Sequence, residues 1–300
     1  MTKNVEAPIR ARLTNHAKET DRPFQEVLQY FGLERFLYRL SQSVHGDSFV
    51  LKGALLLRVW NTPEARPTRD IDLLGHGKSS VRHLEQISRQ LCEMQVEDDG
   101  LVFDASGVSG KRIKEDAEYE GVRVTFVGYL GKARIPIQLD VGFGDAVHPT
   151  PKSVSYPTIL ELPAPRLRVY PHETLVAEKF EAMVKLGLVN SRMKDFYDVW
   201  VLSRQLDFDG ETLAKAVSLT FSNRGTEIEL DPVALSPTFT DSDRVEKQWS
   251  AFARRTLLGS TPITLSGLRE PLREFLLPVA QSLLEGAGFN RTWNAPGPWR

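Results

Sequence analysis

The sequence has 300 residues, a formal net charge of −1 and a hydrophobic content of 41%, which suffice for one large or two modest domains with a buried core. The balanced charge excludes a strongly basic nucleic-acid binder, so any contact with RNA must come from local patches. The single cysteine, Cys92, excludes an internal disulfide and a cysteine-rich zinc site.

The first part of the chain is expected to begin with two helices. Residues 5–20 are polar, and apolar residues over 24–40 recur at helical spacing. A short apolar run then precedes Lys52-Gly53, and the stretch 54–60 predicts the first turns of a buried helix. A strand, a glycine turn and a helix N-terminus offer backbone N–H groups that suit a phosphate.

The next expected strand carries two aspartates, Asp70 and Asp72, with Ile71 between them. Alternate residues of a strand point to the same face, so the two carboxylates share a face while Ile71 points into an apolar layer. At about 6 Å and an effective dielectric of about 20, they repel by roughly 2–3 kcal/mol before screening. A divalent cation would reverse this cost, and oxygen ligands suit Mg²⁺ or Mn²⁺. The alternative for such a pair is a solvated strand edge or a cap.

A strand-rich tract follows a helix that begins after Ser80. The tract is expected to contain strands at 101–103, 122–127 and 133–141. A glycine-containing turn over 128–133 would return the last strand to the sheet and place Asp140 beside the strand of Asp70. The result would be a mixed sheet with helices on one face.

The proline-rich stretch 149–165 is expected to connect this first domain, residues 1–150, to a helical domain over 166–290. Apolar spacing in the second part predicts helices near 172–187, 191–206, 210–221, 243–258 and 266–285. The tail 290–300, which contains two prolines, is expected to be irregular. The predicted fold class is therefore α+β, with a mixed-sheet core packed with helices and a mainly helical C-terminal domain.

Several motifs occur in order along the chain: Lys52-Gly53-Ala54, Thr68-Arg69-Asp70-Ile71-Asp72, the strand carboxylate Asp140, Ala177 to Ala182, and Ser191 to Val199. Together they resemble the AbiEii/AbiGii nucleotidyltransferase toxin family, a MenT-like branch of the DNA polymerase β nucleotidyltransferase superfamily. The likeness runs from about Phe24 to about Leu206. It departs from the superfamily in two places: Ala54 replaces the frequent Ser or second Gly, and the stretch from Gly53 to Asp70 is unusually long.

The resemblance implies a metal-dependent nucleotidyltransferase and a set of site residues. Asp70, Asp72 and Asp140 would hold Mg²⁺ or Mn²⁺, and Asp140 would also help to activate the attacking hydroxyl. From the helical domain, Lys179 would place its charge on the triphosphate and Asp198 would orient it, both contributing to the cleft. The implied nucleotide-binding residues are Lys52, Gly53, Ala54, Lys179, Arg192, Lys194 and Asp195.

Two other interpretations of the helical residues remain open at this point. Lys179 could simply extend beside Glu178 or Glu181. Asp195 and Asp198, three residues apart on one helix face, could form a salt-bridged solvent face.

The resemblance also implies the substrate and partners. It indicates transfer of a nucleoside monophosphate from an NTP to RNA, notably the 3′ end of tRNA, by the toxin of a type IV toxin–antitoxin or abortive-infection system. A cognate antitoxin would be the partner and could modify Thr68, which is otherwise an ordinary strand residue.

Other functions for the same residues are a metal-dependent phosphohydrolase or nuclease and a non-catalytic nucleotide-binding module. No apolar run approaches 18 residues and the N-terminus lacks a signal-peptide pattern, so a cytoplasmic protein with no membrane partner is expected.

Overall fold

The computed structural model describes residues 5–62, 66–114, 120–256 and 264–300, which form two compact units. The first unit comprises residues 1–60, 67–144 and 152–169, and the second comprises 61–66, 145–151 and 170–300. Both units are discontinuous in sequence. Residues 61–66 and 145–150, predicted for the first domain, belong to the second unit, and residues 166–169, predicted for the second domain, belong to the first.

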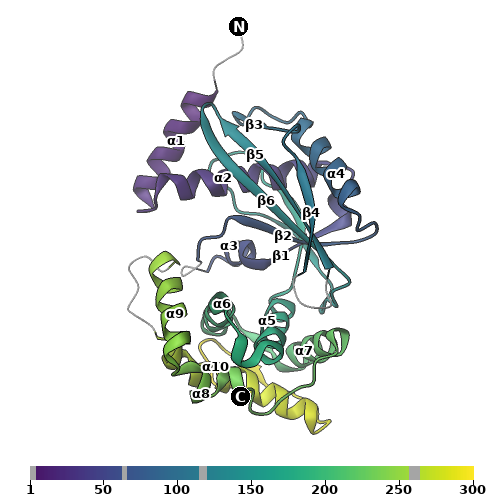
Figure 1. The fold of residues 1–300 in the computed structure, drawn as a ribbon, viewed down its shortest axis with the longest axis vertical. Coiled ribbons are helices and arrows are strands. Elements are labelled where there is room, and N and C mark those ends of the chain that lie inside the picture. The colour runs from purple at the N-terminus through teal and green to yellow at the C-terminus, as the bar shows by residue number, and fades with distance from the viewer. Residues whose placement is uncertain (1–4, 63–65, 115–119, 257–263) are drawn as a thin grey trace. The chain divides into compact units, whose positions relative to one another are not determined.

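The first unit contains a mixed sheet (Figure 1), which in the described residues has eight strands in the order β3-β5-β6-β2-β1-β8-β7, with β4 paired to β5. The strands are β1 Phe49–Lys52, β2 Asp70–Gly75, β3 Leu101–Phe103, β4 Ser109–Lys114, β5 Glu120–Leu130, β6 Ala133–Phe143, β7 Lys152–Ser155 and β8 Arg166–Val169. The pairs β2–β6 and β1–β8 are parallel, whereas the others are antiparallel. The predicted mixed sheet is confirmed.

One face of this sheet is the core of the unit. Ile71 and Leu73 on β2, and every odd-numbered residue of β6 from Ile135 to Val141, are buried. The helices α2 (Phe24–Gln42) and α4 (Val81–Glu93) contact the sheet and each other, and α1 (Glu6–Glu19) contacts α2 (Figure 1). The apolar residues therefore alternate with polar residues that point to the opposite face.

Two local expectations for this unit need adjustment. The stretch 54–60 is helical and largely buried, as predicted, but it is short: a 3₁₀ turn, Gly53–Leu55, precedes the single-turn helix α3, Leu56–Val59, so it carries little of a helix macrodipole. The stretch 149–165, expected to be a connection, contains β7, because antiparallel pairing with β8 satisfies its backbone despite its exposed, polar sequence.

The second unit is mainly helical, as predicted. Its helices are α5 His172–Leu186, α6 Met193–Gln205, α7 Gly210–Arg224, α8 Pro237–Thr240, α9 Asp243–Thr256 and α10 Leu265–Leu284. No described helix of either unit combines the length and the apolar character needed to cross a membrane.

The tail 290–300 of the second unit is mostly irregular, as predicted, but it contains one short strand. The strand β10 (Thr292–Trp293) pairs with β9 (Phe208–Asp209). The rings of Trp293 and Trp299 are buried and lie 4.9 and 5.8 Å from that of Phe275. Aromatic burial and this short strand pairing therefore hold the irregular tail in place.

Candidate functional site

Asp70, Asp72 and Asp140 lie on the face of the sheet opposite its core. β2 and β6 are neighbouring parallel strands, and their register places Asp72 opposite Asp140 and Asp70 opposite Gln138. The prediction that the hairpin returns Asp140 to the strand of Asp70 and Asp72 is confirmed.

Two cations extend this pairing on either side. β5 places Arg123 opposite Asp140, and β1 places Lys52 opposite Asp72. Because directly opposed residues of neighbouring strands point to the same face, Arg123, Asp140, Asp72 and Lys52 form a continuous line across four strands. We call these four residues the charged row.

Arg123 holds Asp140 in a paired contact. Its Nε and Nη2 donate to the two oxygens of Asp140 at 2.8 and 2.7 Å, and Gln138 Nε2 donates to Asp140 Oδ2 at 3.1 Å. These hydrogen bonds with Asp140 raise the pKa of Arg123, and the charges of Asp70 and Asp72 add to the shift. Arg123 thus interacts electrostatically with all three carboxylates. The sequence interpretation did not name Arg123 as a site residue.

Gly53 lies directly against Asp72. Its φ is +75°, and a Cβ atom at this position would lie 2.1 Å from Asp72 Oδ2. A side chain is therefore excluded by both backbone conformation and contact. Lys52 and Ala54 on either side are buried, so backbone atoms rather than a hydroxyl form this edge of the site.

The chemistry of the donor set suits a hard divalent cation. Asp70 and Asp72 are partly exposed on one face, and Mg²⁺ is commonly bound by one or two carboxylates together with phosphates and water. Both oxygens of Asp140 are engaged by Arg123. Within the described ranges, no three or more His, Cys, Asp or Glu side chains are gathered to hold a metal ion. The residues therefore fit a site based on two carboxylates, and ligation by Asp140 stays a prediction.

The second unit contains a buried network around Lys179, which extends from α5. Its Nζ lies 2.6 Å from Asp195 Oδ1 and 2.9 Å from Asp198 Oδ2, both on α6. Arg66 donates from Nε and Nη2 to the two oxygens of Asp198 at 2.7 and 2.9 Å. Asp198 is 0% exposed and Lys179 is 8% exposed, so the interpretation of Asp195 and Asp198 as a solvent face is wrong.

The ion pairs keep this network charged. Burial acts to lower the pKa of Lys179, but the carboxylates of Asp195 and Asp198 outweigh it and the pKa is raised. Burial acts to raise the pKa of Asp198, but Arg66 and Lys179 outweigh it and lower this pKa to about 2. Two cations and two carboxylates therefore compensate each other in a nearly water-free position.

The opposite side of α5 is held by a different cation. Arg224 on α7 donates to Glu181 at 2.9 Å and lies 3.5 Å from Glu178 and 3.2 Å from Asp145. The interpretation that Lys179 extends beside Glu178 or Glu181 is therefore wrong, because those two carboxylates face Arg224. Ion pairs on both sides of α5 fix the position of Lys179.

The remaining predicted residues lie at the starts of elements. Arg192 precedes α6, where its backbone N–H donates to Asn190 Oδ1 at 2.8 Å, and Lys194 in the first turn is exposed. Thr68 lies just before β2, where its hydroxyl accepts the backbone N–H of Asp70 at 3.4 Å. Their roles stay predictions.

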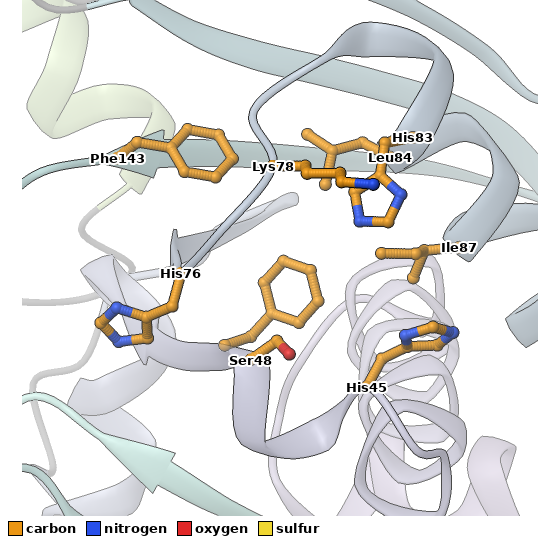
Figure 2. A pocket seen from close by; sticks show the side chains of 9 residues that line it. His45, Ser48, His76, Lys78, His83, Leu84, Ile87 and Phe143 are labelled. Atoms are coloured by element: carbon orange, nitrogen blue, oxygen red, sulfur yellow. The ribbon is translucent and has the colours of Figure 1, made fainter.

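A small pocket of about 40 Å³ lies at the other end of β2. Figure 2 shows its lining, which comprises His45, Ser48, Phe49, His76, Lys78, His83, Leu84, Ile87 and Phe143. His76 follows Asp72 by four residues, a span of about 13 Å along an extended strand, so the pocket is separate from the charged row. Its histidines form no metal-holding group in the part of the chain that the structure describes.

Comparison with known proteins identifies a family. The sequence matches the family model described as nucleotidyl transferase AbiEii toxin, type IV TA system, over residues 35–276. No protein with a curated description matches it. Two solved structures from H. pylori each have 14% identity to this chain and cover 87% of it. One, described only provisionally as a nucleotidyltransferase, has a TM-score of 0.49 over 96% of its length, and the other, JHP933, has 0.44 over 97%.

Because both TM-scores are below 0.5, these two likenesses carry no weight for function. The family match extends over most of the sequence and includes the segments that carry Asp70, Asp140 and Lys179. The chain therefore belongs to the AbiEii nucleotidyltransferase toxin family of type IV toxin–antitoxin systems.

Proposed function

We propose that this nucleotidyltransferase transfers a nucleoside monophosphate from an NTP to a hydroxyl group of an RNA acceptor, the 3′ end of tRNA, and releases pyrophosphate. The observation that supports the proposal best is the charged row, in which carboxylates from two distant strand segments lie side by side next to the backbone of Gly53. A nucleotide added to the 3′ end of tRNA would block translation, which would explain the toxicity of such an enzyme.

In this proposal, Asp70 and Asp72 hold Mg²⁺ or Mn²⁺, with Asp140 as the third carboxylate of the site. The bound metal would neutralise charge on the phosphates during displacement. Gly53 allows a phosphate to approach the backbone closely, because no side chain stands between them.

Lys179 is proposed as a ligand of the triphosphate, with Arg192 and Lys194 as further phosphate contacts. An ammonium group has three N–H donors, and the contacts to Asp195 and Asp198 account for two of them. Those contacts also fix the ammonium in one orientation. Asp195 and Asp198 would therefore position Lys179 rather than contact the reacting atoms.

The competing function is hydrolysis by the same carboxylates, with water as the nucleophile. Membership of a nucleotidyltransferase family favours transfer. Incubation with each of the four α-labelled nucleoside triphosphates and total RNA distinguishes the two. Label that joins RNA of tRNA size supports transfer, whereas shortened RNA without label supports cleavage and contradicts the proposal.

The control for this assay is a pair of matched carboxylate variants. Asp70→Asn should abolish incorporation. Asp21→Asn should not, because Asp21 is an exposed residue after α1 whose φ of +49° also suits Asn. Incorporation that survives in Asp70→Asn would contradict the assigned site.

We further propose that a cognate antitoxin is the partner and that Thr68 is a site of regulation. Thr68 precedes Asp70 by two residues, so an added phosphoryl or nucleotidyl group would bring negative charge next to the carboxylates. Co-expression with a cognate antitoxin followed by intact mass measurement tests this. A mass increase in the wild type that is lost in Thr68→Val supports the proposal, and an unchanged wild-type mass contradicts it.

A further inference from the structure

Arg123 has a contact that the proposed metal chemistry does not use. Its guanidinium fork binds both oxygens of Asp140 at 2.8 and 2.7 Å. This geometry leaves neither oxygen without a strong hydrogen-bond donor. With Gln138 Nε2, three of the roughly four lone-pair positions of Asp140 are taken, so a divalent cation that bound Asp140 directly would compete with the guanidinium for these oxygens.

The charge balance of the row points the same way. Asp72 and Asp140 are flanked by Lys52 on one side and by Arg123 on the other, and β4 places Lys111 opposite Arg123, so cations on both sides already offset the carboxylates. The side chain of Arg123 is 33% exposed, whereas that of Asp140 is 9% exposed. The guanidinium can therefore move toward solvent, or toward an incoming phosphate, while Asp140 stays in place.

We propose that Arg123 is an internal competitor of the divalent cation: it occupies Asp140 in the resting enzyme and releases it when metal and nucleotide arrive together. This inference rests on the proposed function of the acidic residues. In the absence of nucleotide, Arg123 keeps the affinity for metal low. With nucleotide present, the triphosphate offers the guanidinium another anion, and the metal gains access to Asp140.

The experiment is a titration of the whole protein with Mn²⁺, in which free Mn²⁺ is measured by electron paramagnetic resonance without any RNA. Arg123→Gln removes the charge and should bind Mn²⁺ about tenfold more tightly than the wild type, which corresponds to about 1.4 kcal/mol. Arg123→Lys keeps the charge but cannot form the paired contact, and it should bind about threefold more tightly. Arg134→Gln is the matched control, because Arg134 lies on the same face of β6 about 20 Å from Asp140 along the strand.

A double-mutant cycle tests whether the effect acts through Asp140. In an Asp140→Asn background, Arg123→Gln should change Mn²⁺ affinity less than twofold, because there is no carboxylate left to release. Equal tightening in both backgrounds would overturn the competition model and leave only a general charge effect.

A non-hydrolysable NTP analogue provides the second arm. It should raise the Mn²⁺ affinity of the wild type strongly and that of Arg123→Gln much less. Mn²⁺ affinity of Arg123→Gln or Arg123→Lys equal to that of the wild type, in protein with a native circular dichroism spectrum, would overturn the inference. Since the titration involves no RNA, failure of nucleotide incorporation and failure of this inference remain distinguishable.

Discussion

Asp198 offers a direct test of the network that holds Lys179. Its carboxylate is fully buried, accepts two hydrogen bonds from Arg66 and lies 2.9 Å from Lys179. Asp198→Asn keeps the size of the side chain but leaves two buried cations with one carboxylate. Removal of one partner of a buried ion pair typically costs about 3–5 kcal/mol. We therefore expect this loss in the free energy of unfolding, measured by urea denaturation at pH 7.

The matched control is Lys194→Gln on the same helix, an exposed substitution that should change stability by less than about 0.5 kcal/mol. Arg66→Gln and the double variant complete a cycle, and a coupling of about 1 kcal/mol or more is expected for residues in contact. A loss below about 1 kcal/mol in Asp198→Asn, or a coupling near zero, would refute the view that these ion pairs stabilise the site.

The pH dependence gives the same prediction a second measurement. The folded-state pKa of Asp198 is lowered to about 2 from an ordinary value of 3.8. A lowered carboxyl pKa contributes stability that is fully present above the unfolded pKa and is lost as pH falls through the folded pKa. The stability difference between the wild type and Asp198→Asn should therefore be constant above pH 5 and shrink between pH 4 and 2.

Three further predictions concern other parts of the chain. Burial raises the pKa of Glu34 from 4.5 to about 7, so this residue lowers the free energy of unfolding as pH rises from 4.5 to 7, by up to about 3 kcal/mol. Glu34→Gln should remove this pH-dependent loss, which urea unfolding at pH 5 and pH 8 would measure. Gly53→Ala should displace the Asp72 carboxylate and lower transfer at least about 100-fold, whereas Gly225→Ala, also at positive φ but with open space around it, should lower only stability, by about 1 kcal/mol. Lys78→Gln in the separate pocket should leave nucleotide affinity within twofold of the wild type in a fluorescence titration, and a larger loss would show that this pocket takes part in binding.

The position of the acidic strands could be predicted from sequence because the signal is local. The alternation of Asp70 and Asp72 with Ile71 and Leu73 fixes which residues face the core, and the structure confirms that pattern. A glycine turn followed by a returning strand was sufficient to place Asp140 beside them. Burial of one face of a sheet strongly specifies such a register.

Arg123 was missed because its position depends on the turn. The sequence interpretation placed the turn over 128–133, whereas β5 continues to Leu130 and pairs it with Ala133, which leaves Gly131-Lys132 as a two-residue loop. That loop alone sets Arg123 opposite Asp140. A two-residue loop with glycine at positive φ is a recognisable hairpin signal, so the partner of Asp140 could have been found.

Arg66 could not have been found in this way. It contacts Asp198 across 132 residues of sequence, and it lies in a stretch that looks like an ordinary proline-containing connection. Helical spacing predicted correctly that Asp195 and Asp198 share a face. Whether that face is exposed or buried depends on which distant cation packs against it, and local periodicity contains no such information.

The charged row changes the physical reason for expecting a metal ion. Asp70 and Asp72 considered alone repel each other by roughly 2–3 kcal/mol, but Lys52 on the neighbouring β1 and Arg123 on β5, beyond Asp140, offset part of the negative charge. The case for a divalent cation therefore rests on the two partly exposed carboxylates that share one face and on the glycine backbone next to Asp72, rather than on unrelieved repulsion. A site compensated in this way is stable without metal, which makes its metal affinity adjustable through the compensating cation.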